Sequence, residues 1–407
     1  MSSTDGAQPA GWYLASVATF MIPAGIQMVL LPYLLAIELN QPAARFGITQ
    51  MIGQLPILVF LLFGGWLADR VDPRRLLMGL HAAAVLMPLV LAFLVWRNRL
   101  NETHLVLYAL SWGLVTAFAM PARDGLLTRV AGHNVQRMVT LAMGMQFGMQ
   151  MIGQALGGRA AHWGSITILL LQCLVLAAGI PAASRLPAVT AKPAPARGGP
   201  EREPLWRALG GGLALIRADP PMRATFLLAL GMGVFFGGFY VVLIPLAIRD
   251  LYAGGAPDMA LGFMVFALGT LISIVVLTRI GGLAFPGRAL VMALLLGCCA
   301  LSPIAAAPPQ WVFYLCIFFW GMCGGVAMSM SRTILQERAP ASHQSRVMAA
   351  FSLATLGGNP IGSLIMGLGA SALGVRWAVL VPVVGVAVTT AGALAGQSLW
   401  QLRTRSH

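Results

Sequence analysis

Apolar runs long enough to cross a lipid bilayer recur along the whole chain, and they constrain its fold more than any other feature. About 20 apolar residues span the hydrocarbon core as a helix. Because the bilayer core offers the backbone no hydrogen-bonding partner, each run is predicted to be helical. Twelve spans are predicted, at residues 12–37, 46–68, 75–96, 103–122, 137–160, 164–184, 224–247, 259–279, 288–307, 311–331, 346–371 and 376–399.

Charge is too scarce for a water-soluble protein. Only 9% of the 407 residues are charged and 58% are hydrophobic, whereas about 25% of the residues of soluble domains are charged. The net charge of +14 could suit a nucleic-acid partner, but the basic residues occur at loops and helix ends and not on one soluble face. We therefore expect an all-α, multi-pass protein in a lipid bilayer that binds no nucleic acid.

The basic residues also predict an orientation. If both termini and the even-numbered connections share one side, that side receives 20 of the 26 basic residues. Cytoplasmic loops carry an excess of Lys and Arg. Both termini are therefore predicted to be cytoplasmic.

One long polar segment divides the twelve helices into six and six. Residues 185–223 begin with a Pro-rich linker and continue into a predicted amphipathic helix, which separates an N-terminal bundle, 1–184, from a C-terminal bundle, 224–407. A shift of 209 residues aligns Arg123 with Arg332 and Gly153 with Gly362. Internal repeats of this kind build transporters whose halves rock about a central site.

The connection between the second and third predicted helices reads GGWLADRVDPRR at 64–75. It resembles the G-x-L-A-D-R-x-G-R-R signature of the major facilitator superfamily, except that Asp72 and Pro73 replace the usual Gly-Arg. The resemblance implies two pseudo-symmetric six-helix bundles. It also implies that this motif is a conformational latch, an anion being favourable at a facing helix N-terminus; the latch residues are Gly65, Asp69, Arg70, Arg74 and Arg75.

The segments PARDGLL at 121–127 and SRTILQERAP at 331–340 resemble those of the branch that contains the enterobactin exporter and related drug and secretion exporters. Their charges are candidates for ion pairs between the halves that break as the halves rock; solvated loop charges are the alternative. The candidates are Arg123, Asp124, Arg332, Glu337 and Arg338.

Amides, aromatics and methionine are the candidates for a substrate cavity. In the family the first, fourth, seventh and tenth helices line the cavity, and the fifth predicted helix carries glutamines on one stripe, which face either the cavity or another helix. The same helix has Gly144 and Gly148 on its far side, predicted to pack closely. The cavity candidates are Gln27, Trp112, Gln146, Gln150, Phe235, Phe239, Tyr240, Phe319 and Asn359.

No acidic or basic residue lies in the middle third of a predicted span. Proton coupling therefore follows from the family resemblance and not from these residues, with Glu38 as the candidate coupling group and His81 as a weaker one. Cys173, Cys298, Cys299, Cys316 and Cys323 show no metal-binding spacing. We expect no metal, no cofactor and no catalytic residue.

The leading hypothesis is a monomeric secondary transporter in a bacterial-type inner membrane. It would export an amphipathic small molecule by alternating access, in exchange for protons. One alternative is a lipid or lysolipid transporter of the same fold. A remote one is an intramembrane enzyme, for which the sequence offers no constellation of catalytic residues.

Overall fold

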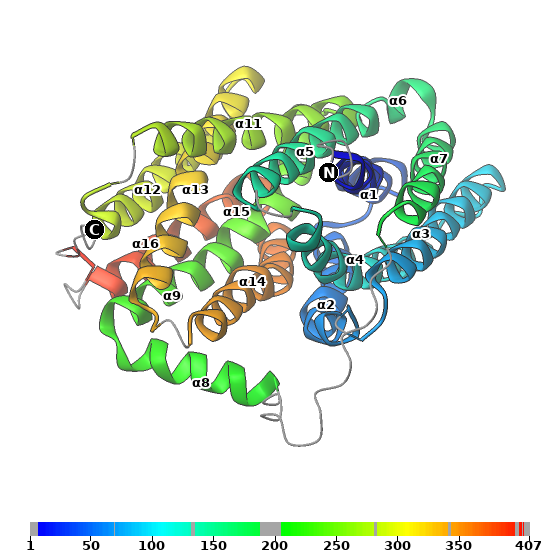
Figure 1. Cartoon of the computed structure of the whole chain (residues 1–407). Coiled ribbons are helices and arrows are strands. Elements are labelled where there is room, and N and C mark those ends of the chain that lie inside the picture. The colour runs from blue at the N-terminus through cyan, green and yellow to red at the C-terminus, as the bar shows by residue number, and fades with distance from the viewer. Residues whose placement is uncertain are drawn as a thin grey trace. The chain divides into compact units, whose positions relative to one another are not determined.

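The computed structural model is helical throughout the part of the chain that it describes (Figure 1). That part comprises residues 7–68, 70–131, 135–187, 205–280, 283–340, 343–394, 399–400 and 402. Two compact units are formed: residues 1–41, 52–200 and 254–261 make the first, and residues 42–51, 201–253 and 262–407 the second. The fold is all-α, as predicted.

The helices of the N-terminal part follow one another through short connections. They are α1 (Ala7–Tyr33), which continues as the π-helical turn η1 (Leu34–Glu38), α2 (Ala43–Ala68), α3 (Pro73–Trp96), α4 (Glu102–Val130), α5 (Val135–Gly157), the single turn α6 (Ala160–Trp163) and α7 (Ser165–Ser184).

The C-terminal part begins with the predicted amphipathic helix, α8 (Leu205–Ala218). It continues with α9 (Pro220–Gly231), the π-helical segments η2 (Met232–Gly237) and η3 (Phe239–Leu243), α10 (Ile244–Tyr252), α11 (Ala256–Ile280), α12 (Pro286–Leu301), the 3-10 turn η4 (Ser302–Ala306), α13 (Gln310–Arg338), α14 (Gln344–Leu373), α15 (Val375–Ala378) and α16 (Leu380–Leu394).

Eleven helices of the described chain are long and apolar enough to cross a membrane. The fifth predicted span, 137–160, is present as α5 but is not among them. Four glutamines and four glycines lower the hydropathy of α5. A helix of this composition needs protein neighbours on at least part of its surface.

Several predicted boundaries were wrong. The prediction ended the fourth span at 122 and the tenth at 331, but α4 and α13 continue to Val130 and Arg338. Charged residues placed in loops therefore lie on helices. The linker was drawn too long, because α9 already begins at Pro220, with Asp219 as its N-cap accepting a hydrogen bond from the backbone N–H of Met222.

Glycines allow two helix pairs to pack backbone against backbone. In the first unit, a Cβ on Gly153 of α5 would overlap the carbonyl oxygen of Ile22 on α1. In the second unit, a Cβ on Gly362 of α14 would overlap the carbonyl oxygen of Val234 in η2. Small residues permit this close approach in membrane helices.

A buried hydrogen-bonded chain ties three helices of the first unit together. The hydroxyl of Tyr108 on α4 donates to Oε1 of Gln172 on α7 at 3.0 Å, and Nε2 of Gln172 donates to the carbonyl oxygen of Pro23 on α1 at 3.3 Å. Both side chains are buried. A buried amide whose oxygen and nitrogen both have hydrogen-bond partners stabilises the fold without placing a charge in the bilayer.

Candidate functional site

Asp72 and Pro73, the two residues of the motif between α2 and α3 that depart from the family signature, lie at the start of α3. Asp72 is the N-cap of α3, where its Oδ1 accepts the backbone N–H of Arg74 at 3.1 Å, and Pro73 occupies the first helical position. Asp and Pro suit these two positions because the carboxylate satisfies a free N–H and proline has none to satisfy. Asp72 and Pro73 therefore give α3 a strong N-terminus.

The latch itself stays a prediction. Asp69, its central residue, lies outside the described residues. Arg70 is exposed in the turn after α2, and its backbone N–H donates to the carbonyl oxygen of Leu67 at 3.0 Å. Gly65 lies on α2, Arg74 is half-buried and Arg75 is exposed on the first turn of α3.

Arg123 is buried within the first unit. Its side chain is only 7% exposed, and its guanidinium carbon lies 4.8 Å from the centre of the Phe20 ring on α1. The hydroxyl of Tyr13 donates to the carbonyl oxygen of Arg123 at 3.3 Å. A cation over an aromatic face is stabilised in the absence of a carboxylate. These contacts lie within the first unit, and an inter-half ion pair of Arg123 and Asp124 stays a prediction.

In the second unit, Arg338 has a partner that the sequence analysis did not identify. Its guanidinium forms a salt bridge of 2.8 Å with Asp219, the N-cap of α9. The predicted linker had included Asp219, so its position beside the end of α13 was not foreseen. Arg332 and Glu337 lie exposed on the last turns of α13.

Two of the predicted glutamines on α5 converge on one sulfur atom. Nε2 of Gln150 and Nε2 of Gln154 lie 3.3 Å and 3.4 Å from Sδ of Met28 on α1. Thioether sulfur is a weak acceptor. Gln146, one turn earlier, is exposed. The glutamine stripe is therefore exposed at Gln146 and contacts α1 at Gln150 and Gln154.

The tight packing of α5 uses other glycines than those predicted. A Cβ on Gly144 or Gly148 would meet nothing within 4 Å, whereas Gly153 and Gly157 lie against the backbone of α1. The prediction for Gly144 and Gly148 was wrong because glycine spacing alone does not identify the neighbouring helix. The face of α5 that packs on α1 therefore carries these two glycines, with the amides of Gln150 and Gln154 beside them.

An aromatic cluster surrounds Trp320 of α13 in the second unit. The Trp320 ring lies 5.0 Å from Phe239, 5.5 Å from Phe236 and 4.6 Å from Phe266, measured between ring centres. Tyr240 contacts Phe266 at 4.7 Å. Edge-to-face and tilted geometries of this kind stabilise aromatic pairs. Two of the predicted cavity aromatics, Phe239 and Tyr240, belong to this cluster.

The remaining cavity candidates lie in different surroundings. Trp112 stacks on Phe20 at 5.6 Å in the first unit. Phe235 packs on α16, where a Cβ on Gly385 would overlap its ring, and Phe319 is 49% exposed. Asn359 lies over Gly237 of η2, which leaves no room there for a larger residue.

The coupling candidates are both hydrogen bonded. Ser165, at the first position of α7, donates to Oε1 of Glu38, which is exposed at the end of η1. His81 is fully buried; its Nδ1 lies 2.8 Å from the carbonyl oxygen of Leu77, and its Nε2 lies 3.4 Å from Oγ1 of Thr19. A Cβ on Gly179 of α7 would overlap the imidazole. This is the environment of a packed histidine.

Several buried side-chain polar atoms of the described residues have no hydrogen-bond partner, and three of them bear on ligand binding. They are Oε1 of Gln27 on α1, Oε1 of Gln154 on α5 and Nε1 of Trp320 on α13. Each such atom costs roughly 1–3 kcal/mol if nothing binds it. The first unit therefore has two unpartnered acceptors and the second unit has one unpartnered donor. Among the described residues no group of three or more metal-binding side chains occurs.

Comparison with known proteins now identifies the family. The model of the Major Facilitator Superfamily matches residues 13–354 and, again, 238–398. The chain belongs to this superfamily. It is a membrane-embedded transporter, not an enzyme.

Solved structures share the fold at low sequence identity. A mutant of the nucleoside transporter NupG is 12% identical, with a TM-score of 0.75 over 95% of this chain and 99% of that chain. A bacterial homologue of the human lysosomal transporter Spinster, inward-facing and unoccupied, is 14% identical, with a TM-score of 0.73 over all of both chains. An auto-inhibited peptide transporter of the POT family is 14% identical, with a TM-score of 0.71 over 98% of both chains. No curated protein sequence matches.

Two site residues lacked a sequence signal strong enough to find them. Met28 and Phe20 sit in apolar runs, where one more methionine or phenylalanine carries no information about its neighbours. Asp219 did carry a signal, since Asp followed by two prolines and a helical run is typical of a helix start. That pattern would have placed the beginning of α9 correctly.

Proposed function

We propose that this superfamily member exports an amphipathic, uncharged or weakly charged small molecule from the cell in exchange for protons. The observations that carry the proposal are unpartnered buried polar atoms within each unit taken by itself: the amide oxygens of Gln27 and Gln154 in the first and the indole N–H of Trp320 in the second. A cargo with hydrogen-bond donors and an apolar body would satisfy the two amide oxygens of the first unit and pack beside Met28.

The absence of deep charges supports this class of cargo. Every acidic or basic residue in the described spans lies within a few turns of a helix end. The most deeply buried one, Arg123, is covered by Phe20. A cargo with a full charge would need an opposite charge in a water-excluded site. Methionine at Met28, between Gln150 and Gln154, adds a flexible surface suited to varied shapes.

Direction, branch and coupling rest on the sequence. The 64–75 motif and the arginine-containing segments at 121–127 and 331–340 resemble those of the exporter branch, and the distribution of basic residues favours cytoplasmic termini. The inner membrane of a bacterial-type cell is the expected location, and a monomer the expected state. Proton exchange belongs to the same resemblance, with Glu38 as the coupling group.

Efflux from proteoliposomes tests the proposal. Purified protein would be reconstituted with a panel of labelled compounds, including neutral amphipathic compounds, an anionic compound and a lysolipid. An imposed proton gradient should drive movement of the neutral amphipathic compounds, and a protonophore should abolish it. Transport that persists without the gradient would exclude proton exchange, and movement of the lysolipid alone would favour a lipid transporter.

Variants sharpen that experiment. Gln27→Leu and Trp320→Phe should each weaken the apparent affinity for cargo about tenfold, since a hydrogen bond worth about 1–1.5 kcal/mol is lost. Trp377→Phe is the matched control, because Trp377 is 55% exposed at the start of the last predicted span. Unchanged affinity in both Gln27→Leu and Trp320→Phe would show that these side chains do not bind the cargo.

A further inference from the structure

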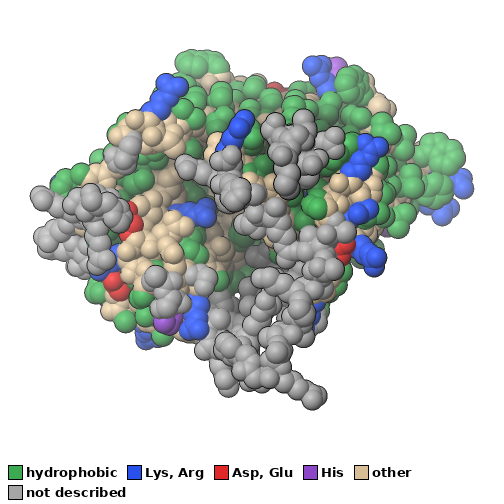
Figure 2. Space-filling view, viewed as in Figure 1, with side chains coloured by type: hydrophobic (Ala, Val, Ile, Leu, Met, Phe, Trp, Pro, Cys, Tyr) green, Lys and Arg blue, Asp and Glu red, His purple; other side chains and the backbone are tan. Residues whose placement is uncertain are grey.

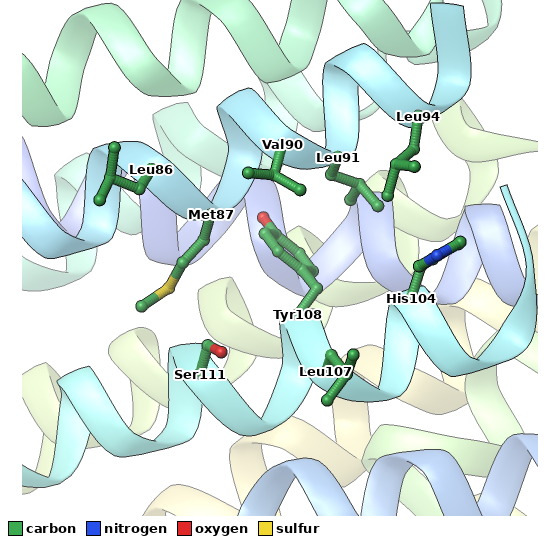
Figure 3. A pocket seen from close by; sticks show the side chains of 9 residues that line it. All are labelled: Leu86, Met87, Val90, Leu91, Leu94, His104, Leu107, Tyr108 and Ser111. Carbon is green, nitrogen blue, oxygen red and sulfur yellow. The ribbon is translucent and has the colours of Figure 1, made fainter. Parts of the chain in front are cut away.

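Two apolar grooves flank the C-terminal half of α3. The first, of about 240 Å³, lies between residues 86–94 of α3 and residues 104–111 of α4. Figure 3 shows Tyr108 pointing from α4 toward α3, with His104 at one end of the groove and Ser111 at the other. The second, of about 440 Å³, lies between residues 89–96 of α3 and Ile166 and Leu170 of α7. Val90 lines both grooves.

The side chains around these grooves are exposed although they are strongly apolar. Leu86, Val90 and Leu107 are 61%, 57% and 55% exposed. Figure 2 shows hydrophobic side chains over the region where Figure 1 places α3, with basic side chains at its edge. On a membrane-spanning helix such side chains contact lipid. Because pockets for drug-sized ligands hold roughly 300–1,000 Å³, the smaller groove suits a segment of hydrocarbon chain.

Charge and polarity are concentrated at one end of the grooves. Arg97 is the C-cap of α3, and its guanidinium carbon lies 5.4 Å from the Trp96 ring and 5.5 Å from the Phe93 ring. Arg99 is exposed two residues later, and Nδ1 of His104 is buried without a hydrogen-bond partner. Tryptophan and arginine at a helix end are typical of the headgroup level of a bilayer. Guanidinium groups bind phosphate well.

We propose that α3, together with α4 and α7, binds one two-chain anionic phospholipid. One acyl chain lies in each groove, on either side of Val90, and the phosphate lies near Arg97 and Arg99. The lipid is a bound component of the protein and not its cargo, so this inference is independent of the proposed function.

Lipid retention by the purified full-length protein tests the headgroup. Delipidated protein in detergent would be mixed with dioleoyl phosphatidylglycerol or dioleoyl phosphatidylcholine and examined by native mass spectrometry. The wild type should retain phosphatidylglycerol about 25-fold more strongly, since each of the two basic residues near the membrane surface contributes about 1 kcal/mol, or about fivefold. Arg97→Gln with Arg99→Gln should remove most of that preference. Arg159→Gln is the control, because Arg159 is exposed at the start of α6 and lines neither groove.

Filling the grooves tests the chains. Ser111→Phe should block the first groove and Leu170→Trp the second, and each should lower retention of phosphatidylglycerol about fivefold or more. Leu174→Trp is the control, because Leu174 is 67% exposed on α7 and lines neither groove. If Ser111→Phe fails to fold, the variants at the exposed positions Leu170, Arg97 and Arg99 still test the lipid proposal. Equal retention of the two lipids by the wild type, or full retention after Leu170→Trp, would overturn the proposal.

Discussion

The contact of α1 with α5 and the contact of η2 with α14 have the same backbone arrangement but different side chains around it. Gly153 and Gly362, 209 residues apart, each lie against a carbonyl oxygen of the partner helix. Beside the first contact, Gln150 reaches the sulfur of Met28. Beside the second, Asn359, which is 209 residues after Gln150, lies over Gly237. The repeat therefore keeps the close backbone packing, while the neighbouring polar groups have diverged.

The partner helices differ in their backbone as well. The segment from Met232 to Leu243 is almost wholly π-helical, whereas α1 is regular until η1 at its end. π-Helical turns widen a helix by one residue and are frequent at functional sites. The two halves therefore differ in helix geometry at equivalent positions of the repeat.

The largest expected effect concerns the shared contact itself. Gly153→Val and Gly362→Val should each destabilise the protein by about 3 kcal/mol or more, because the new side chain must displace a helix backbone. Thermal unfolding in detergent would measure both. Gly148→Ala is the control and should be neutral or slightly stabilising, because a Cβ there meets open space. A large effect at only one of Gly153 and Gly362 would break the equivalence of the two contacts.

The next effect separates a partnered glutamine from an unpartnered one. Gln172→Leu should cost roughly 1–3 kcal/mol of stability, because the hydroxyl of Tyr108 loses its acceptor in a buried site. Gln27→Leu should leave stability unchanged or raise it, since Oε1 of Gln27 has no partner to lose and its burial costs free energy. The equivalent position in the second half, 209 residues after Tyr108, is the buried Ile317. Ile317 has no hydroxyl, so the hydrogen bond from Tyr108 to Gln172 has no counterpart at that position. Equal losses of stability would contradict the distinction.

Helix starts provide a smaller contrast between the halves. Both α3 and α12 begin with proline, but Asp72 caps α3 whereas the N-cap of α12, Phe285, makes no side-chain cap. Asp72→Ala should therefore cost about 1 kcal/mol. Asp72→Asn keeps the cap and should retain most of the stability, which thermal unfolding can resolve. If both variants lose the same amount, the carboxylate acts through its charge and not as a cap.

The smallest effect belongs to the second half. Arg338→Gln should cost less than about 1 kcal/mol, because its ion pair with Asp219 is partly exposed. Asp219→Ala should cost more, since Asp219 also caps α9. Adding salt should weaken the wild type slightly and leave Arg338→Gln unaffected. A larger loss in Arg338→Gln than in Asp219→Ala would show that the cap contributes little.

The predicted spans gave the helices of the fold correctly, with errors concentrated at their ends. Helices α4 and α13 were drawn short because Arg123 and Arg332 were interpreted as loop residues, although a helix can continue beyond the apolar core with its charges on the surface or over a ring. A contact of Gln150 and Gln154 with another helix was one of two alternatives, and only the structure shows that both amides reach the sulfur of Met28. The latch, the cargo and the coupling group stay predictions.

Composition and periodicity by themselves determined that the chain lies in a bilayer as apolar helices, because a backbone without water must satisfy its own hydrogen bonds. The repeat of 209 residues also indicated two related halves. Only the tertiary structure decided which face of each helix meets which neighbour: that Gly153 and not Gly148 admits α1, and that Arg123 is covered by Phe20. A nearly uniform apolar sequence does not mark its contact faces, because in lipid they depend on the fit of shapes more than on polarity.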